Sequence, residues 1–148
     1  MKTKIFIQFI SIGIILFTIQ MNALGIKPEH PNYLHALSDL RAARWMIEHR
    51  PGDWQRTVDE VATVKQIEEA INEIKKASID DSKDINDHPM ANEIPEHIGR
   101  LQAAVDYLKK AQENINKEED NGFAQGLQAS SLKHIKEAIR LAEKAISQ

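Results

Sequence analysis

The sequence predicts an all-α fold, an antiparallel four-helix bundle preceded by a cleavable signal peptide. Three observations lead to it. Apolar residues recur three or four positions apart in four separate segments. No segment alternates β-branched and polar residues as a half-buried strand does. Turn-forming clusters of proline, glycine or acidic residues separate the segments. Each segment has one apolar side, so the four must bury those sides against each other.

The N-terminus has the organisation of a secretory signal. Lys2 and Lys4 give a basic start, residues 5–19 are almost wholly apolar, and the small residues Ala23 and Gly25 follow. The apolar stretch is shorter than the ~20 residues that a membrane-spanning helix needs. We therefore expect cleavage, and not a retained membrane anchor.

The expected domains are a signal peptide over residues 1–25 and a helical bundle over residues 26–148, in a periplasmic or secreted product. Cleavage removes two lysines and no acid, which lowers the formal charge from −3 to −5. The chain has no basic run of the kind that nucleic acid requires, so we expect no nucleic-acid partner, and no membrane partner after cleavage. It also has no cysteine, which excludes disulfides, a lipid anchor on cysteine and c-type haem.

Two helices are expected in the first half of the mature chain. Proline is favoured in a first turn, so the first helix is expected from Pro31 to about His49, where a Pro-Gly turn stops it. The second is expected from about Thr57 to Ile79. Its apolar side consists of Val61, Val64, Ile67, Ile71 and Ile74.

Two more helices are expected in the second half, over about 94–116 and from the turn at Gly122 almost to the end. The third carries Ile98, Leu101, Val105, Leu108 and Ile115, and the fourth Leu127, Leu132, Ile135, Ile139, Ala142 and Ile146. Short links after the first and third helices favour antiparallel neighbours. The link over 80–95 is longer. The simplest solution is an up-down-up-down bundle.

Two arginines interrupt the apolar side of the first helix. At 100° per residue, Arg44 falls inside the apolar arc and Arg41 lies on its edge. The arc comprises Tyr33, Leu37, Leu40, Ala43 and Ile47. A buried guanidinium must find an acceptor. The arginines either tie the helix to an acidic loop or hold a small anion, such as a ligand carboxylate.

The long link supplies the expected acidic partners. Asp80 and Asp81 lie near the end of the second helix, where the helix dipole disfavours acids, so a positive group is expected nearby. Asp87 follows in the same link. The candidate ligand-binding site is therefore formed by the two arginines, Arg41 and Arg44, with these three aspartates.

A divalent metal is the one cofactor that the sequence suggests, and nothing in the sequence requires it. His35 and Asp39 are four residues apart and so are neighbours on a helix, and His88 lies in the acidic link. These three are the candidate metal ligands. The calcium-loop template fails from Asp80, because its sixth position is Ile85 and not glycine. A solvated or locally hydrogen-bonded pair is the preferred explanation of His35 and Asp39.

Three function classes follow. The preferred one is a binding or interaction module for an unknown small anion or protein partner. The enzyme alternative is a metal-dependent hydrolase that uses the His35, Asp39 and His88 site. The third is a purely structural helical protein that pairs with another exported chain through exposed Trp45, Met46 or Trp54. No Glu-x-x-His, His-Glu-x-x-His or Gly-x-Ser-x-Gly motif occurs, so no reaction is fixed.

Three blocks give the chain a resemblance. His30-Pro31-Asn32-Tyr33-Leu34-His35-Ala36-Leu37-Ser38-Asp39-Leu40-Arg41-Ala42-Ala43-Arg44 resembles the opening block of a group of small exported bacterial helical proteins of unassigned function. Asp80-Asp81-Ser82-Lys83 with Asp87-His88-Pro89, and Glu118-Glu119-Asp120-Asn121 with Gly126-Leu127, resemble its later blocks. Ser82 departs from the glycine expected there. The resemblance implies export and a helical fold, and it supplies no activity.

Overall fold

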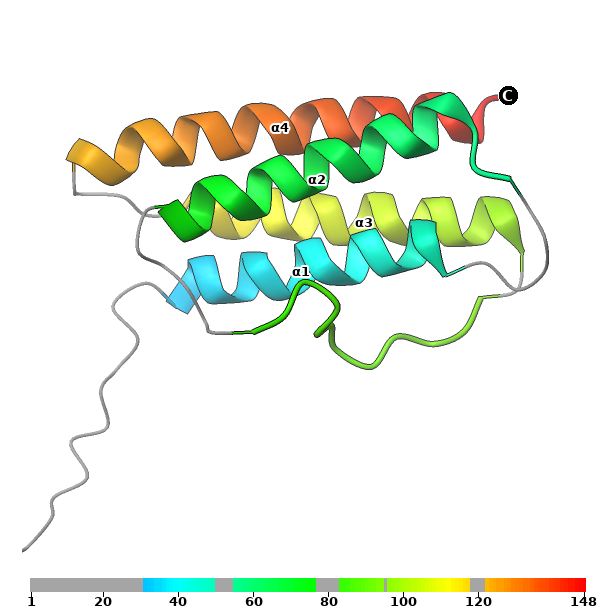
Figure 1. The fold of residues 1–148 in the computed structure, drawn as a ribbon, viewed down its shortest axis with the longest axis horizontal. Helices are drawn as coiled ribbons and strands as arrows, with labels where there is room; N and C mark the ends of the chain where they lie inside the picture. Colours follow the sequence, from blue (N-terminus) through cyan, green and yellow to red (C-terminus); the bar gives the residue numbers. More distant parts are fainter. Residues whose placement is uncertain (1–30, 50–54, 77–82, 95, 118–121) are drawn as a thin grey trace, which may run out of the picture.

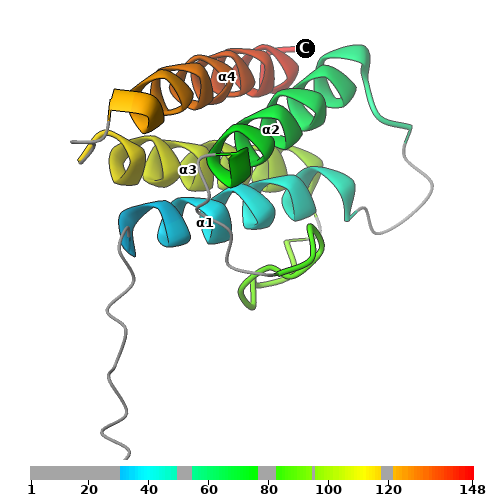
Figure 2. The ribbon, with the colours of Figure 1, turned by 60° about the vertical axis from the view of Figure 1, so that its left-hand side comes forward.

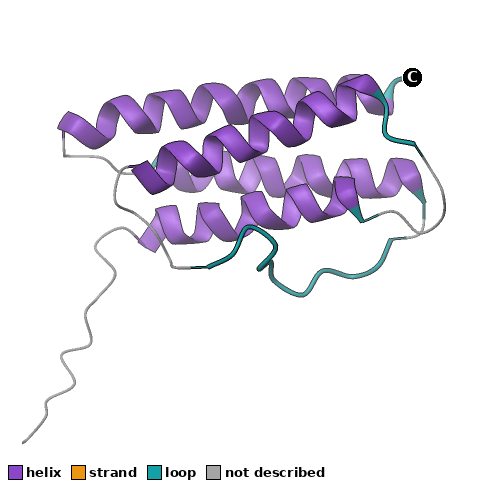
Figure 3. Ribbon diagram, viewed as in Figure 1, coloured by secondary structure: helices purple, strands orange, loops and turns teal. Residues whose placement is uncertain are grey.

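Four helices make up the fold. The computed structural model describes residues 31–49, 55–76, 83–94, 96–117 and 122–148. Within these ranges it contains α1 (Pro31–Glu48), α2 (Val58–Lys76), α3 (His97–Ile115) and α4 (Gly122–Ile146), and no strand (Figures 1 and 3). The all-helical four-helix architecture is therefore confirmed. The signal peptide predicted over 1–25 lies outside the described residues. Among the described helices, none has the length and apolar character needed to cross a membrane.

The helices are packed as a ring of four. α1 packs on α3 and, less extensively, on α2, while α4 packs on α2 and α3. The α1–α4 and α2–α3 pairs make no such contact, so they lie diagonally across the bundle (Figures 1 and 2). The most extensive interfaces thus join helices that are not consecutive in the sequence.

The order of helix directions differs from the up-down-up-down expectation. α1 and α4 run one way, and α2 and α3 both run the other way (Figure 1). Contacts between helix ends agree: Lys144 near the end of α4 donates to Asp59 at the start of α2 (Nζ–Oδ1 2.9 Å), and Gln128 of α4 donates to the Ile115 carbonyl at the end of α3 (2.6 Å). Every pair of packed neighbours is antiparallel, and the topology is up-down-down-up.

A long connection follows from this topology. Because α2 ends at the end of the bundle opposite to the start of α3, the chain must travel back along the bundle. Residues 83–94, which we call the crossover, run beside α1 without helical structure (Figures 1 and 2). Twelve residues in extended form reach about 40 Å, against about 28 Å for a 19-residue helix.

The core fills the space between the helices, and most predicted apolar positions belong to it. Two of them are exposed instead: Val61 is 50% exposed and Ile98 is 48% exposed. The inward position in the first turn of α2 is taken by Glu60, which is 1% exposed. The core side of α2 therefore passes through residue 60 and not 61, which turns Val61 toward solvent.

The start of α2 is fixed by a reciprocal cap. The Thr57 amide donates to Glu60 Oε2 at 2.9 Å, and the Glu60 amide donates to Thr57 Oγ1 at 3.2 Å. This is a capping box, which satisfies two main-chain donors that a helix start leaves open. The cap also holds the Glu60 side chain in its buried position.

Replacing the cap should cost stability in a measurable way. We expect Thr57→Ala to lower the free energy of unfolding by about 1 kcal/mol, because an amide in the first turn loses its acceptor. Urea denaturation followed by circular dichroism measures this free energy of unfolding. Val58→Ala is the matched control, since Val58 is 86% exposed, and it should stay within about 0.5 kcal/mol. Equal stability of the two variants would contradict the role of the cap.

Candidate functional site

The two arginines of α1 face the crossover. Arg41 is 1% exposed and its Nη2 donates to the Lys83 carbonyl at 3.3 Å. Arg44 is only partly buried. The expectation that Arg44 lies inside the buried arc and Arg41 on its edge is therefore reversed. The reason is that the crossover packs along this side of α1 and covers Arg41, which a wheel drawn for an isolated helix does not include.

Arg44 joins three elements. Its Nε donates to Glu68 Oε1 of α2 at 3.0 Å, and its Nη1 lies 2.7 Å from Glu48 Oε2 on the next turn of α1. The same Nη1 donates to Asn86 Oδ1 of the crossover at 3.1 Å. Two carboxylates and one amide oxygen thus surround a single guanidinium. The arginine therefore links α1, α2 and the crossover.

The crossover meets these arginines through neutral oxygens. Asp84 Oδ1 accepts from the backbone amide of Asn86 at 2.9 Å and from its Nδ2 at 2.8 Å. These bonds fix the amide group so that its oxygen is presented to Arg44. Of the aspartates expected as partners, Asp87 is exposed, and Asp80 and Asp81 lie outside the described residues. The link is therefore joined to the arginines as expected, but the contacts described use a main-chain carbonyl and an asparagine.

Three aromatic rings lie beside the arginines. The Trp45 ring stacks on the His49 ring with a centroid distance of 4.4 Å and an interplanar angle of 11°. The His88 ring of the crossover lies 4.8 Å from the Trp45 ring at 34°. Trp45 is thus in contact with an imidazole from its own helix and with one from the crossover.

These groups line a cleft of about 240 Å³ between α1 and the crossover, which we call the crossover cleft. Its lining consists of Arg41, Arg44, Trp45, Glu48, His49, Ile85, Asn86 and His88. The cleft combines cationic, aromatic and amide groups from two elements that are far apart in the sequence. Such a combination can hold a planar anion.

The predicted metal ligands are not gathered into one site. His35 is exposed on α1, while Asp39 accepts from Asn114 of α3 (Nδ2–Oδ2 3.2 Å). His88 lies at Trp45, with its Nδ1 2.9 Å from the Pro89 carbonyl oxygen. In the part of the chain that the structure describes, no three His, Asp or Glu side chains are placed to hold a metal ion.

The residues expected to meet a protein partner also differ from expectation. Met46 is 2% exposed and belongs to the core, so it is not available as a contact. Trp45 lies in the crossover cleft. Trp54 is outside the described residues. Of the three residues expected to contact a protein partner, only Trp45 is both described and partly exposed.

A second charged cluster, which was not predicted from the sequence, lies where α2 and α3 begin. Glu60 Oε1 pairs with His97 Nε2, although Glu60 is almost fully buried. Arg100, 2% exposed, extends Nη1 to the Ile94 carbonyl at 3.5 Å. Two signals were present: Thr57 and Glu60 have capping-box spacing, and Arg100 occupies the same helical side as Leu101 and Leu108.

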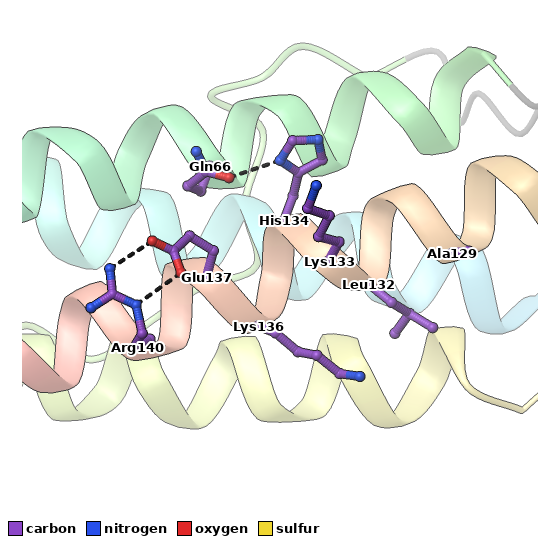
Figure 4. A pocket seen from close by; sticks show the side chains of 8 residues that line it. All are labelled: Gln66, Ala129, Leu132, Lys133, His134, Lys136, Glu137 and Arg140. Atoms are coloured by element: carbon purple, nitrogen blue, oxygen red, sulfur yellow. Dashed lines mark hydrogen bonds and ion pairs between the residues drawn. The ribbon is translucent and has the colours of Figure 1, made fainter.

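A larger groove lies over α4, away from α1 (Figure 4). It has a volume of about 810 Å³ and is lined by Gln66, Ala129, Leu132, Lys133, His134, Lys136, Glu137 and Arg140. We call it the α4 groove. His134 Nδ1 lies 2.8 Å from Gln66 Oε1 of α2, which closes one side. His134 is itself half-buried.

The α4 groove has a cationic lining with two uncommitted lysines. Arg140 forms a bidentate pair with Glu137, at 2.8 and 2.6 Å (Figure 4). Lys133 and Lys136 are exposed, and neither pairs with an acid among the described residues. In Figure 4, Lys133 extends toward the α2 side and Lys136 toward the α3 side. The sequence does not predict this groove, because the pattern of α4 shows only an ordinary solvated face.

Comparisons with known proteins give no match: no protein-family model, no curated protein and no solved structure matches this chain.

Asp39 supplies a test of the half-buried surface between α1 and α3. Burial raises its pKa, although Lys110, Asn114 and His35 act in the opposite direction. The unfolded chain releases this proton near pH 4, whereas the native state keeps it up to the raised pKa of the folded chain. Ionised Asp39 consequently lowers stability as the pH rises toward neutrality.

We expect Asp39→Asn, which keeps an acceptor for Asn114, to gain stability relative to the parent chain as the pH rises from about 3 to about 7. Urea denaturation across that range measures the difference. Asp106→Asn is the control, because Asp106 is exposed on α3. A difference that stays constant with pH, or that falls, would show that burial does not govern this carboxyl group.

Proposed function

We propose that this chain is an exported helical-bundle binding module that holds a small planar anion in the crossover cleft. The observation that carries the proposal is the convergence of α1 and the crossover on one cleft. There, two guanidinium groups, an indole and two imidazoles line the same 240 Å³. A crossover that served only to connect α2 to α3 would not need this set of side chains.

The charge of the cleft favours an anion. Arg41 and Arg44 contribute two positive charges to the lining and Glu48 one negative charge, and either imidazole adds positive charge when protonated. Arg44 uses Nε and Nη1 in its bonds to Glu68, Glu48 and Asn86. Its Nη2 has no described partner and is a donor for a carboxylate that enters the cleft.

The size and the rings define the ligand further. Drug-sized ligands occupy pockets of about 300–1,000 Å³, so a 240 Å³ cleft suits a smaller molecule. Stacked rings at Trp45 offer a flat surface to a planar group. A small aromatic carboxylate therefore fits both the charge and the shape.

One observation favours the structural alternative, in which the arginines act only as internal ties. Glu48 and Glu68 already neutralise Arg44, and Arg41 is occupied at the Lys83 carbonyl. In that case the chain would act through a protein partner and not through a small ligand. The metal-dependent hydrolase has no comparable support, because its three ligands are not gathered.

Fluorescence of Trp45 distinguishes these functions. The chain has two tryptophans, so Trp54→Phe leaves Trp45 as the only reporter. We expect benzoate to change the Trp45 fluorescence saturably. Benzamide should change it far more weakly because it lacks the negative charge. Cyclohexanecarboxylate should also change it weakly, because it cannot stack on the rings. In the Trp54→Phe chain, Arg44→Met should weaken benzoate binding at least about tenfold, because one charge-assisted hydrogen bond is lost.

Arg140→Met is the matched control, since Arg140 is exposed on α4, outside the crossover cleft, and its benzoate binding should not change. If Arg44→Met is as stable as the parent or more stable and still binds benzoate equally, the anion site is wrong. If no carboxylate changes the Trp45 signal, the internal-tie interpretation is preferred.

Export rests on the signal organisation of residues 1–25, with cleavage proposed after Ala23 or Gly25. We expect the full sequence, expressed in a bacterial host, to give a periplasmic product whose intact mass lacks these residues. Ile14→Asp interrupts the apolar stretch and should leave the uncleaved chain in the cell. A full-length mass in the periplasmic extract would rule out cleavage.

A further inference from the structure

We propose that the α4 groove binds the crossover of a second copy of this chain, so that copies associate head to tail. The proposal goes beyond the anion site and does not depend on it. It rests on two surfaces of the same molecule, a cationic groove with an apolar floor and an acidic segment with an exposed apolar side chain.

The groove is the receiving surface. Its apolar lining includes Ala129 and Leu132, while Lys133 extends toward the α2 side and Lys136 toward the α3 side (Figure 4). Because neither lysine is paired with a described acid, both charges are available to a partner. The groove therefore fits a segment that places an apolar side chain between two acids.

The crossover carries such a segment on its exposed side. Asp87 and Glu93 are exposed, and neither carboxylate pairs with a described basic group. Met90 lies between them in the sequence and is fully exposed, the most exposed large apolar side chain among those described. Methionine adapts its shape to irregular apolar surfaces. A flexible apolar side chain flanked by acids complements the groove in both charge and polarity.

The spacing is compatible with this fit. Asp87, Met90 and Glu93 are three residues apart, which corresponds to about 10 Å between successive members in an extended chain. With Met90 on Leu132, each acid lies within reach of one long lysine side chain. The two acids would thus face Lys133 and Lys136 on opposite sides of α4.

The positions of the two surfaces exclude a contact within one copy. The crossover runs beside α1, and α1 lies diagonally opposite α4 (Figures 1 and 2). A contact between different surfaces of identical copies is heterologous, and it extends into an open row unless a rotation closes it. A short segment in a shallow groove buries less area than a stable dimer does, so the association should be weak and salt-sensitive.

Sedimentation velocity on the chain recovered from a periplasmic extract tests the proposal. We expect the weight-average mass to rise with protein concentration at about 0.01 M salt and to return to the monomer at about 1 M salt. Lys133→Glu with Lys136→Glu should weaken association at least about tenfold. The matched control is Lys65→Glu with Lys117→Glu, which makes the same charge change at two exposed lysines outside the groove and should associate as the parent does.

A mixing experiment makes the test specific for head-to-tail contact. Asp87→Lys with Glu93→Lys should also be monomeric alone, as should the Lys133→Glu, Lys136→Glu chain. In a mixture of these two variants, one chain carries the reversed groove and the other carries the reversed crossover. The acidic crossover of one chain then fits the lysine groove of the other, and the reversed basic crossover fits the reversed acidic groove, so the mixture should associate in alternating rows although each chain alone does not. A chain carrying all four reversals should associate again.

Three outcomes would overturn the proposal. If the parent chain stays monomeric at low salt, the groove does not bind a second copy, and a foreign acidic segment becomes the preferred occupant. A closed dimer that is insensitive to both pairs of reversals places self-association on another surface. A loss of association in the Lys65→Glu, Lys117→Glu control shows that net charge is responsible, and not the groove.

Discussion

Two buried arginines hold the crossover at its two ends, and the arrangement of the bundle depends on them. Arg41 of α1 reaches the Lys83 carbonyl at one end, and Arg100 of α3 reaches the Ile94 carbonyl at the other. A guanidinium taken out of water needs acceptors, and a connection without helical structure has main-chain carbonyls that its own backbone does not use. Each arginine therefore gains an acceptor, and each of these carbonyl groups gains a donor. Gly99 completes the second anchor, because a Cβ there would lie 2.9 Å from Ile94 Cγ2.

The helices were predictable because their apolar spacing is regular and their ends carry local signals. Pro31 and the capping-box residues fix helix starts whatever the rest of the chain does. The topology was not predictable in the same way. An up-down-up-down order requires the shortest connections, and only the long 80–95 link pointed to another solution. Once that link is a crossover, its coverage of α1 decides which of Arg41 and Arg44 is buried, and no single-helix pattern contains that information.

The candidate site was predictable in outline and not in its contacts. Arg41 and Arg44 were placed with the acidic link because charge within an apolar arc must be compensated, and they do meet it. The sequence could not specify that Asn86, held by Asp84, would present the oxygen to Arg44. Trp45 and His88 are 43 positions apart, and only the tertiary path of the chain brings their rings together. The same holds for Glu60 and His97.

The parallel course of α2 and α3 has a consequence for the order in which the chain can acquire structure. α1 makes its more extensive interface with α3 and only a smaller one with α2, so its apolar side stays largely uncovered until residues 97–115 are present. Interfaces between elements distant in the sequence also slow the search for the native state. In a polypeptide that crosses a bilayer N-terminus first, the early segments would then remain extended while the rest is still being translocated. For the export proposed above, the connectivity would thus keep the chain competent for passage until its third helix emerges.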